Sequence, residues 1–234
     1  MHEAVPELVT LHLWRVPWRA VPAAVARMAT ERRPVRSQPG VRFAKLLGTG
    51  DGRTFTVRDS DPRRWGLLVT WADRASARAF ERSPTVARWR RLAEEAWRVE
   101  LRPLSARGRW SGREPFGRPG GGRWEGPVAA VTRARLAVTR SATFWRAVPP
   151  VSLDLAGRPG LRLAVGIGEV PVGLQGTFSL WASPGALREF AYGGAAHRAV
   201  VERTDRERWY AEELFARFAV EDAAGSVDGR NPLA

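Results

Sequence analysis

Apolar and polar residues alternate along the N-terminal half of the chain with two different periods. Short apolar runs rich in β-branched residues are typical of strands, and apolar residues three or four positions apart are typical of helices. Pro22 favours a helix start, and the helix that follows it would place Val21, Val25 and Met28 on one apolar side. The pattern predicts, in order, a strand at 8–14, a helix from about 17 to 33, strands at 41–47 and 66–71 on either side of a glycine-rich turn at 48–52, a helical region at 80–92 interrupted at Pro84, and a strand at 99–101.

The same pattern is present a second time in the C-terminal half. Residues 39–44 read Pro-Gly-Val-Arg-Phe-Ala, and residues 159–164 read Pro-Gly-Leu-Arg-Leu-Ala. The run at 66–72, which ends in Trp-Ala, returns at 176–182, and a helical stretch follows in both copies. The second copy is therefore predicted to hold a strand from 128, a helix around Phe144 and Trp145, strands at 161–167 and 176–181, a helix, and a strand at 215–220.

Each copy has the order strand–helix–strand–strand–helix–strand, which is the ferredoxin-like unit of an α+β protein. Two such units in one chain commonly join their sheets, so we expect tandem ferredoxin-like repeats that form a single-chain dimeric α/β barrel. Trp110 and Trp124 indicate that the connection between the repeats packs on the body. The predicted boundaries are 1–104 for the first repeat, 105–127 for a Gly/Pro/Arg-rich linker, 128–220 for the second repeat and 221–234 for a flexible tail.

Composition narrows the classes of protein that the chain can represent. The 234 residues contain no cysteine, which excludes disulfides, iron–sulfur clusters and thiolate-ligated metals, so a metal would need histidine or carboxylates. The net charge is +14, and every basic residue except Lys45 is arginine. We interpret this charge as a mostly solvated surface that attracts an acidic protein partner, with no nucleic-acid partner. No apolar run approaches the ~18 residues that span a bilayer and no signal peptide is evident, so a cytoplasmic location is expected.

One histidine distinguishes the second copy from the first. His197 occupies the position that corresponds to Ala87, and it shares a predicted helix face with Val200 and Val201, so its side chain should point inward. A core histidine bonded to a carbonyl accounts for this pattern, and so does a metal ligand. The pattern alone leaves both interpretations open.

Other polar residues are weaker candidates. Gln175, Thr177 and Ser179 alternate along the strand before His197, where they would either face a bound ligand or face solvent. His12 lies in mid-strand, and its alternation partners define no polar pocket. Glu212 and its neighbour Glu213 are interpreted as a solvated pair.

Several catalytic classes lack their motifs. The sequence contains neither G-x-S-x-G nor H-E-x-x-H, and Gly48-Thr49-Gly50 is followed by Arg53 where a dinucleotide-binding fingerprint needs glycine. A nucleophile-elbow hydrolase, a zinc protease of that type and a Rossmann cofactor domain are therefore disfavoured.

Four separated motifs occur in order along nearly the whole chain. They are 43–50 together with Phe55-Thr56, 109–116, 166–171 and 209–218. Together they resemble the spheroidene monooxygenases, a family of carotenoid ketolases. The glycine-rich stretch between Phe116 and Val128 and the arginine-rich surface depart from the pattern of that family.

The resemblance implies a haem-dependent monooxygenase that uses haem b, with His197 as the axial iron ligand. It implies that reduced haem and O₂ hydroxylate an activated methylene of an apolar, carotenoid-like substrate, and that a second round followed by loss of water leaves a ketone. Gln175, Thr177, Ser179 and Arg53 are the candidates for handling oxygen, and Lys45 and Arg198 for pairing with haem propionates. The expected partners are an acidic ferredoxin-type electron donor and, for substrate access, a peripheral membrane contact.

Two alternative hypotheses stay open at this point. One keeps the barrel without oxygen activation at haem, as a cofactor-free monooxygenase or a haem-dependent dehydratase. The other is an RNA-binding tandem module, because the stretches 14–19 and 88–91 interleave tryptophan with arginine. Against the second, the strand at 41–45 lacks the aromatic signature of RNA-binding ferredoxin-like domains.

Overall fold

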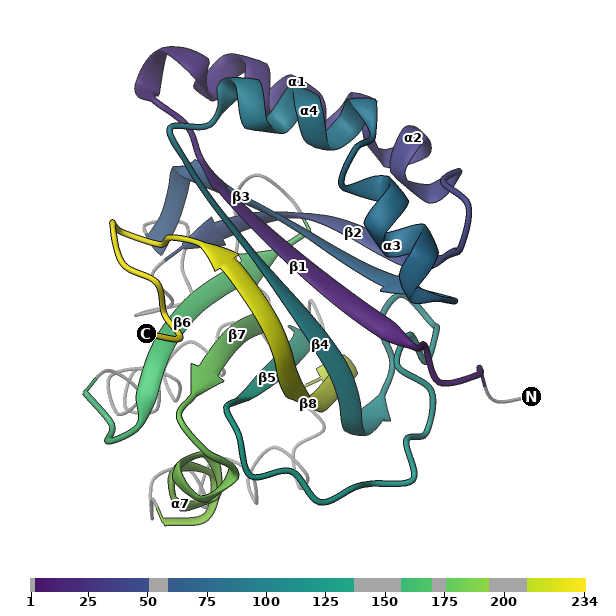
Figure 1. The fold of residues 1–234 in the computed structure, drawn as a ribbon, viewed down its shortest axis with the longest axis vertical. Helices are drawn as coiled ribbons and strands as arrows, with labels where there is room; N and C mark the ends of the chain where they lie inside the picture. Colours follow the sequence, from purple (N-terminus) through teal and green to yellow (C-terminus); the bar gives the residue numbers. More distant parts are fainter. Residues whose placement is uncertain (1–2, 51–58, 137–156, 170–175, 194–209) are drawn as a thin grey trace.

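The computed structural model describes residues 3–50, 59–136, 157–169, 176–193 and 210–234, and the strands in these ranges close into one barrel (Figure 1). Neighbouring strands are antiparallel, and the order around the barrel is β1-β3-β2-β6-β7-β5-β8-β4. The strands are β1 (Leu8–Arg15), β2 (Val41–Gly50), β3 (Ser60–Trp71), β4 (Glu95–Gly108), β5 (Val128–Leu136), β6 (Leu161–Gly168), β7 (Gly176–Trp181) and β8 (Tyr210–Gly225).

The barrel consists of two sheets with the same internal order. The first repeat contributes β4-β1-β3-β2 and the second contributes β8-β5-β7-β6. Their registers also agree, since Leu8 lies opposite Trp71 in the first sheet and Val128 lies opposite Trp181 in the second. Two seams, β2–β6 and β4–β8, join the sheets. The predicted single-chain barrel of tandem ferredoxin-like repeats is therefore confirmed.

Helices cover the outside of the first sheet as one layer (Figure 1). Asp73 starts α3 by accepting a hydrogen bond from the amide of Ser76 at 2.7 Å, and Ser83 caps α4 with Pro84 as its first residue. No helix among the described residues is long and apolar enough to cross a membrane. The described helices are η1 (Trp18–Ala20), α1 (Val21–Thr30), α2 (Arg32–Arg36), α3 (Arg74–Phe80), α4 (Pro84–Leu92) and α7 (Pro184–Gly193).

The helix expected at 17–33 differs from the prediction in its extent and in its buried side. It is divided into η1, α1 and the start of α2, and Ala24 and Met28 are the residues of α1 that are buried. Val25, which the sequence pattern placed on the apolar side, is 41% exposed. The buried side of α1 is therefore centred on Ala24 and Met28, and not on the predicted row that included Val25.

The barrel interior is filled by apolar side chains from every strand. Leu11, Leu68, Val99, Phe178 and Phe218 are all buried in one cluster there. A ferredoxin-like module that binds RNA uses the open face of its sheet. In this chain that face is the packed interior of a closed barrel, which argues against the RNA-binding hypothesis. A ligand site must therefore lie outside the barrel wall or at its ends.

Several strands are longer than predicted, because barrel pairing continues past the local apolar pattern. β2 runs to Gly50, through part of the predicted glycine-rich turn, and pairs there with both β3 and β6. Within this stretch the Thr49 hydroxyl donates a hydrogen bond to the carbonyl of Arg64 at 2.7 Å. β4 and β8 likewise extend far beyond the predicted cores at 99–101 and 215–220.

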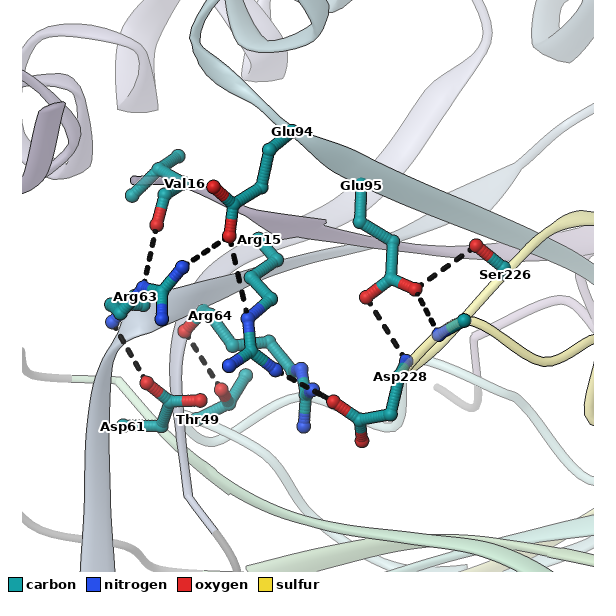
Figure 2. A network of polar contacts seen from close by, with 11 residues as sticks. Arg15, Val16, Thr49, Asp61, Arg63, Arg64, Glu94, Glu95, Ser226 and Asp228 are labelled. Atoms are coloured by element: carbon teal, nitrogen blue, oxygen red, sulfur yellow. Dashed lines mark hydrogen bonds and ion pairs between the residues drawn. The ribbon is translucent and has the colours of Figure 1, made fainter. Parts of the chain in front are cut away.

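The segment after β8 is held against the first repeat. Glu95, at the start of β4, accepts hydrogen bonds from the amides of Asp228 and Gly229 at 3.0 and 2.7 Å. The Asp228 carboxylate in turn pairs with Arg15 at 2.6 Å, and Figure 2 shows these groups meeting at one end of the barrel. The prediction of a flexible tail at 221–234 is wrong, because contacts with the other repeat order it.

A matching turn follows β4. Ser111 and Gly112 have φ values of 56° and 74°, and Asp228 and Gly229 have 53° and 74°. Glu212 of β8 accepts from the amides of Ser111 and Gly112 at 2.9 and 2.7 Å, as Glu95 does at the other turn. Each turn thus presents two amides to one carboxylate of the opposite repeat.

These two turns are also copies of each other in sequence. Residues 108–116 read G-R-W-S-G-R-E-P-F and residues 225–233 read G-S-V-D-G-R-N-P-L. Each repeat therefore includes the turn segment after its last strand, and the predicted boundaries at 104 and 220 cut through β4 and β8. Trp110 is buried and Trp124 packs, half-buried, against the cluster of Val128, Trp181 and Leu187, so the connection packs on the body as these two residues predicted.

Candidate functional site

The outer face of the first sheet is packed with large side chains under its helices. Trp14, Trp65 and Trp71 are fully buried there together with Trp89 of α4. The rings of Trp14 and Trp89 stack with centroids 5.1 Å apart. This face is a second hydrophobic core, which packs the helices of the first repeat onto its sheet.

The corresponding face of the second sheet carries much smaller residues. The strand registers of the two repeats match, so positions can be compared one by one. Directly opposed residues share a face, which places this set on the outside of the barrel, the side of Trp181. The pairs, first repeat then second, are Thr10 and Ala130, His12 and Thr132, Leu46 and Gly166, Leu67 and Thr177, and Val69 and Ser179.

We call Ala130, Thr132, Gly166, Thr177 and Ser179 the small-residue face. It is bounded on one side by Trp181, whose ring stacks on Phe190 of α7 at 5.1 Å. In the first repeat, Leu46, Leu67 and Val69 pack under the helices from these positions. The second repeat has smaller side chains at the same positions. The difference between the repeats thus creates a flat wall of backbone, methyl groups and hydroxyls outside the barrel.

Ser179 has a structural partner on this face. The indole Nε1 of Trp181 donates a hydrogen bond to the Ser179 hydroxyl at 2.9 Å. In the first repeat the equivalent indole, Trp71, donates to Thr10 at the same distance. Ala130 stands in place of Thr10 and has no hydroxyl, so the indole N–H of Trp181 finds its acceptor in β7, on Ser179, and not in β5. Ser179 therefore orients Trp181, and Thr177 is the predicted oxygen-handling residue whose hydroxyl remains available on this face.

The other predicted ligand-binding residues lie outside the described residues. These are His197, Arg198, Gln175 and Arg53, together with the predicted helix around 144–145. Their roles stay predictions. Among the residues that the structure does describe, no three histidine, aspartate or glutamate side chains come together as a metal-binding group.

A buried charged cluster lies at one end of the barrel, beside the small-residue face. Arg133 of β5 is 3% exposed and pairs with Glu169 at 2.6 Å and with Glu212 at 2.7 Å. Lys45 of β2 pairs with Glu169 as well and donates to the Ser111 hydroxyl at 2.6 Å. We call these residues the Arg133 cluster. It joins both repeats through charge-assisted hydrogen bonds.

The carboxylates of the Arg133 cluster are held ionised. Burial raises the pKa of Glu169, but hydrogen bonds from Lys45 and from the Trp110 indole outweigh it, so the pKa lies below its ordinary value. Burial also raises the pKa of Glu212, and the amides of Gly112 and Ser111 with Arg133 reverse that effect. Neither carboxylate has the raised pKa that a general acid needs at neutral pH.

The Arg133 cluster unites the four motifs that the sequence analysis singled out. Lys45, Ser111, Glu169 and Glu212 come from the motifs at 43–50, 109–116, 166–171 and 209–218, respectively. At the opposite end of the barrel the residues that correspond to Arg133, Lys45, Glu169 and Trp110 are Leu13, Val165, Thr49 and Val227. The cluster is therefore a feature of one end only.

These contacts change the interpretation of several residues. Lys45, the candidate partner of a haem propionate, forms an ion pair with Glu169, and its role toward a haem stays a prediction. Glu212 is a partly buried clamp for the turn at 110–113, where a solvated pair was expected. His12 is buried, and its Nε2 donates to Glu81 at 2.6 Å, so it is a core histidine of the first repeat.

Sequence could have revealed these roles only through the second copy of the turn. The paired segments 108–116 and 225–233 signal a repeated structural element, and a repeated element requires a repeated carboxylate partner. Nothing in the local pattern around Glu95 or Glu212 marks either residue as that partner. Each carboxylate binds the turn of the opposite repeat, at least 100 residues away in the sequence.

Comparison with known proteins agrees with the architecture. No protein-family model matches the chain. A crystal structure of aldoxime dehydratase superimposes with a TM-score of 0.60 at 12% sequence identity, over 94% of this chain and 84% of the other. Aldoxime dehydratase in complex with butyraldoxime gives 0.57 at 14% identity, over 92% and 79%. Identities this low show a shared fold alone.

Sequence relatives are much closer. Spheroidene monooxygenase of Rhodobacter capsulatus is 35% identical over 221 residues, which cover 92% of this chain and 90% of that protein. Spheroidene monooxygenase of Rubrivivax gelatinosus is 42% identical over 199 residues, covering 84% and 75%. With its four motifs in order and this identity over nearly its whole length, the chain belongs to the spheroidene monooxygenase family.

Proposed function

We propose that this chain is a haem-dependent monooxygenase that oxygenates an apolar, carotenoid-like small molecule with O₂ and electrons from an external donor. The names of its relatives support a monooxygenase. The observation that carries the cofactor part is the small-residue face, where the second repeat lacks the side chains that fill the first. An acidic ferredoxin-type protein is the donor that the basic surface would attract.

The described residues fit a flat, largely apolar cofactor. Gly166 has no side chain and Ala130 has only a methyl group, so the backbone of β6 and β5 forms a smooth wall. Leu46 and Leu67 project from the same positions of the first repeat and would block it. The face supplies hydroxyls but no imidazole, so the iron ligand would have to come from another part of the chain, and His197 is the candidate for it.

The residues of this face would position the cofactor and its substrate. A bound haem would supply the activation of O₂ that oxygenation of carbon requires. Thr132 and Thr177 lie directly opposite each other and place two hydroxyls on the wall, where they can donate hydrogen bonds to a ligand oxygen. The stacked rings of Trp181 and Phe190 place apolar surface along one side of the wall.

The first test restores the residues of the first repeat. In the double variant Gly166→Leu/Thr177→Leu, side chains as large as those of Leu46 and Leu67 occupy the wall, and we expect haemin titration to give no Soret absorption band. The matched control Gly166→Ala/Thr177→Ser keeps small side chains and should bind haem like the unmodified chain. Far-UV circular dichroism checks that both variants fold.

The second test addresses the predicted ligand. His197→Ala should abolish or shift the Soret band, and His12→Gln, which alters the core histidine of the first repeat, should leave the band in place. Turnover of a carotenoid should require both O₂ and a reductant, which separates this function from a dehydratase. Failure of the unmodified chain to take up haem would refute the proposed cofactor.

A further inference from the structure

The outward side of α1 carries no charged side chain of its own. Its exposed residues are proline, alanine, valine and threonine, and Val25 is 41% exposed. The one charged residue of the helix, Arg27, is half-buried and pairs with Glu31 at 3.6 Å. A helix that faces water normally carries charged residues on that side. α1 therefore presents an apolar strip where an ordinary surface helix would be polar.

A tryptophan extends this strip at its N-terminal end. Trp18 of η1 is 66% exposed, although the other described tryptophans of the first repeat are buried in its two cores. The guanidinium of Arg63 lies 5.7 Å from the centre of its ring. Tryptophan with one face in water and one in an apolar phase is typical of residues at a membrane–water interface.

The helices around the strip are strongly basic. Residues 18–40 and 72–94, which contain η1 and α1–α4, hold eleven arginines and four acidic residues. Each acidic residue is engaged: Glu31 by Arg88, Asp73 by the start of α3, Glu81 by His12, and Glu94 by Arg63. The exposed arginines that form no ion pair with any described residue are Arg19, Arg32, Arg33, Arg36, Arg78, Arg82 and Arg91.

We infer that this helical layer, η1 with α1–α4, is a contact surface for an anionic lipid bilayer. The arginines complement the negative charge of the headgroups, and Trp18, Val25 and the uncharged strip of α1 enter the interface between headgroups and acyl chains. An acidic protein would also attract the arginines. It would not require an exposed tryptophan beside a charge-free helix side, so the observations favour the membrane.

The helical layer is separate from the proposed cofactor wall. Figure 1 shows α1–α4 together over the first sheet, whereas α7 lies beside the second. The inference goes beyond the proposed function and does not depend on it, since it uses no residue of the small-residue face. It also predicts an orientation, with the first repeat toward the bilayer.

Vesicle co-sedimentation tests the surface. We expect the full chain to bind vesicles of phosphatidylcholine with 30 mol% phosphatidylglycerol, and to bind pure phosphatidylcholine vesicles far more weakly. The triple variant Arg19→Gln/Arg33→Gln/Arg91→Gln should bind the anionic vesicles roughly 100-fold more weakly, since an arginine near such a surface is worth about 1 kcal/mol. The control Arg109→Gln/Arg188→Gln/Arg230→Gln removes the same charge from exposed sites outside the layer and should retain binding.

Depth-dependent quenching tests the tryptophan. Lipids that carry a spin label near the headgroup should quench part of the fluorescence of the bound protein, and Trp18→Phe should remove that component. Equal loss of binding in the two triple variants would overturn the inference. So would binding of the helical layer to an acidic protein, such as a plant ferredoxin, without binding to anionic vesicles, because the layer would then be a protein-docking surface.

Discussion

Replacing Arg133 by leucine, the residue at the corresponding position of the first repeat, should lower the free energy of unfolding by about 3 kcal/mol. Arg133 is almost fully buried and bridges Glu169 and Glu212 at 2.6 and 2.7 Å. Leucine removes the cation but leaves two carboxylates in a partly buried site, and an uncompensated buried charge costs far more than a pair contributes. Most of the lost unfolding free energy therefore comes from the carboxylates of Glu169 and Glu212, which lose their cation.

Urea unfolding at pH 7, followed by tryptophan fluorescence, measures this change. The midpoint should fall with an unchanged m-value, and the melting temperature should drop by roughly 6–12 °C for a chain of this size. The double variant Arg133→Leu/Glu169→Gln removes one stranded carboxylate, so its loss should be smaller than the sum of the two single losses. A loss below about 1 kcal/mol for Arg133→Leu, or strict additivity, would refute the reasoning.

Three further outcomes follow from the fold. Glu95→Ala should destabilise by about 0.5–1.5 kcal/mol, because the exposed amides of Asp228 and Gly229 exchange a carboxylate acceptor for water; chemical denaturation measures the loss. Gly108→Ala should destabilise by more than about 1 kcal/mol, since a Cβ at φ +89° would lie 2.2 Å from the carbonyl oxygen of Glu213; thermal melting measures it. Stability conferred by Glu81 should be present above pH 4.5 and lost as the pH falls below it, because the hydrogen bond from His12, against the effect of burial, lowers the pKa of that carboxyl in the folded state.

Each of these predictions has a control. Glu125→Ala changes an exposed glutamate whose only described ion pair is with Arg123, and it should leave stability within about 0.5 kcal/mol. Gly112→Ala has a positive φ but open space around its Cβ, so it should cost less than Gly108→Ala. In Glu81→Gln the free energy of unfolding should fall less between pH 6 and pH 3 than it does in the unmodified chain. A Glu81→Gln chain with the same acid sensitivity as the unmodified chain would contradict the assignment.

Sequence alone predicted the architecture because the two copies carry the same short-range patterns. The runs at 39–44 and 159–164 and at 66–72 and 176–182 each correspond to paired strands, and a repeated ferredoxin-like order limits the ways in which two sheets can close. Strand ends were predicted less well. β2 continues through Gly48 and Gly50 because β6 supplies hydrogen-bonding partners that no local pattern reveals.

The candidate site was predicted only in part. Thr177 and Ser179 do lie on one outer face, since alternation along a strand fixes which residues share a side. The packing of that face could not be predicted, because it depends on comparing five matched positions across two sheets. The Arg133 cluster was hidden for a similar reason. Its members are Arg133 and residues of four distant motifs, and only barrel closure brings Lys45 next to Glu169.

The seam between β4 and β8 is the longer of the two within the residues that the structure describes. Along β4–β8 the backbone pairing runs from Trp97 to Gly108, whereas the described pairing of β2 with β6 spans only Gly48 to Gly50, with the Lys45–Glu169 ion pair just beyond it. Separating the repeats costs least where the fewest hydrogen bonds must break. The long β4–β8 seam should therefore be among the last parts of the barrel to open, and amide exchange along it should be slow.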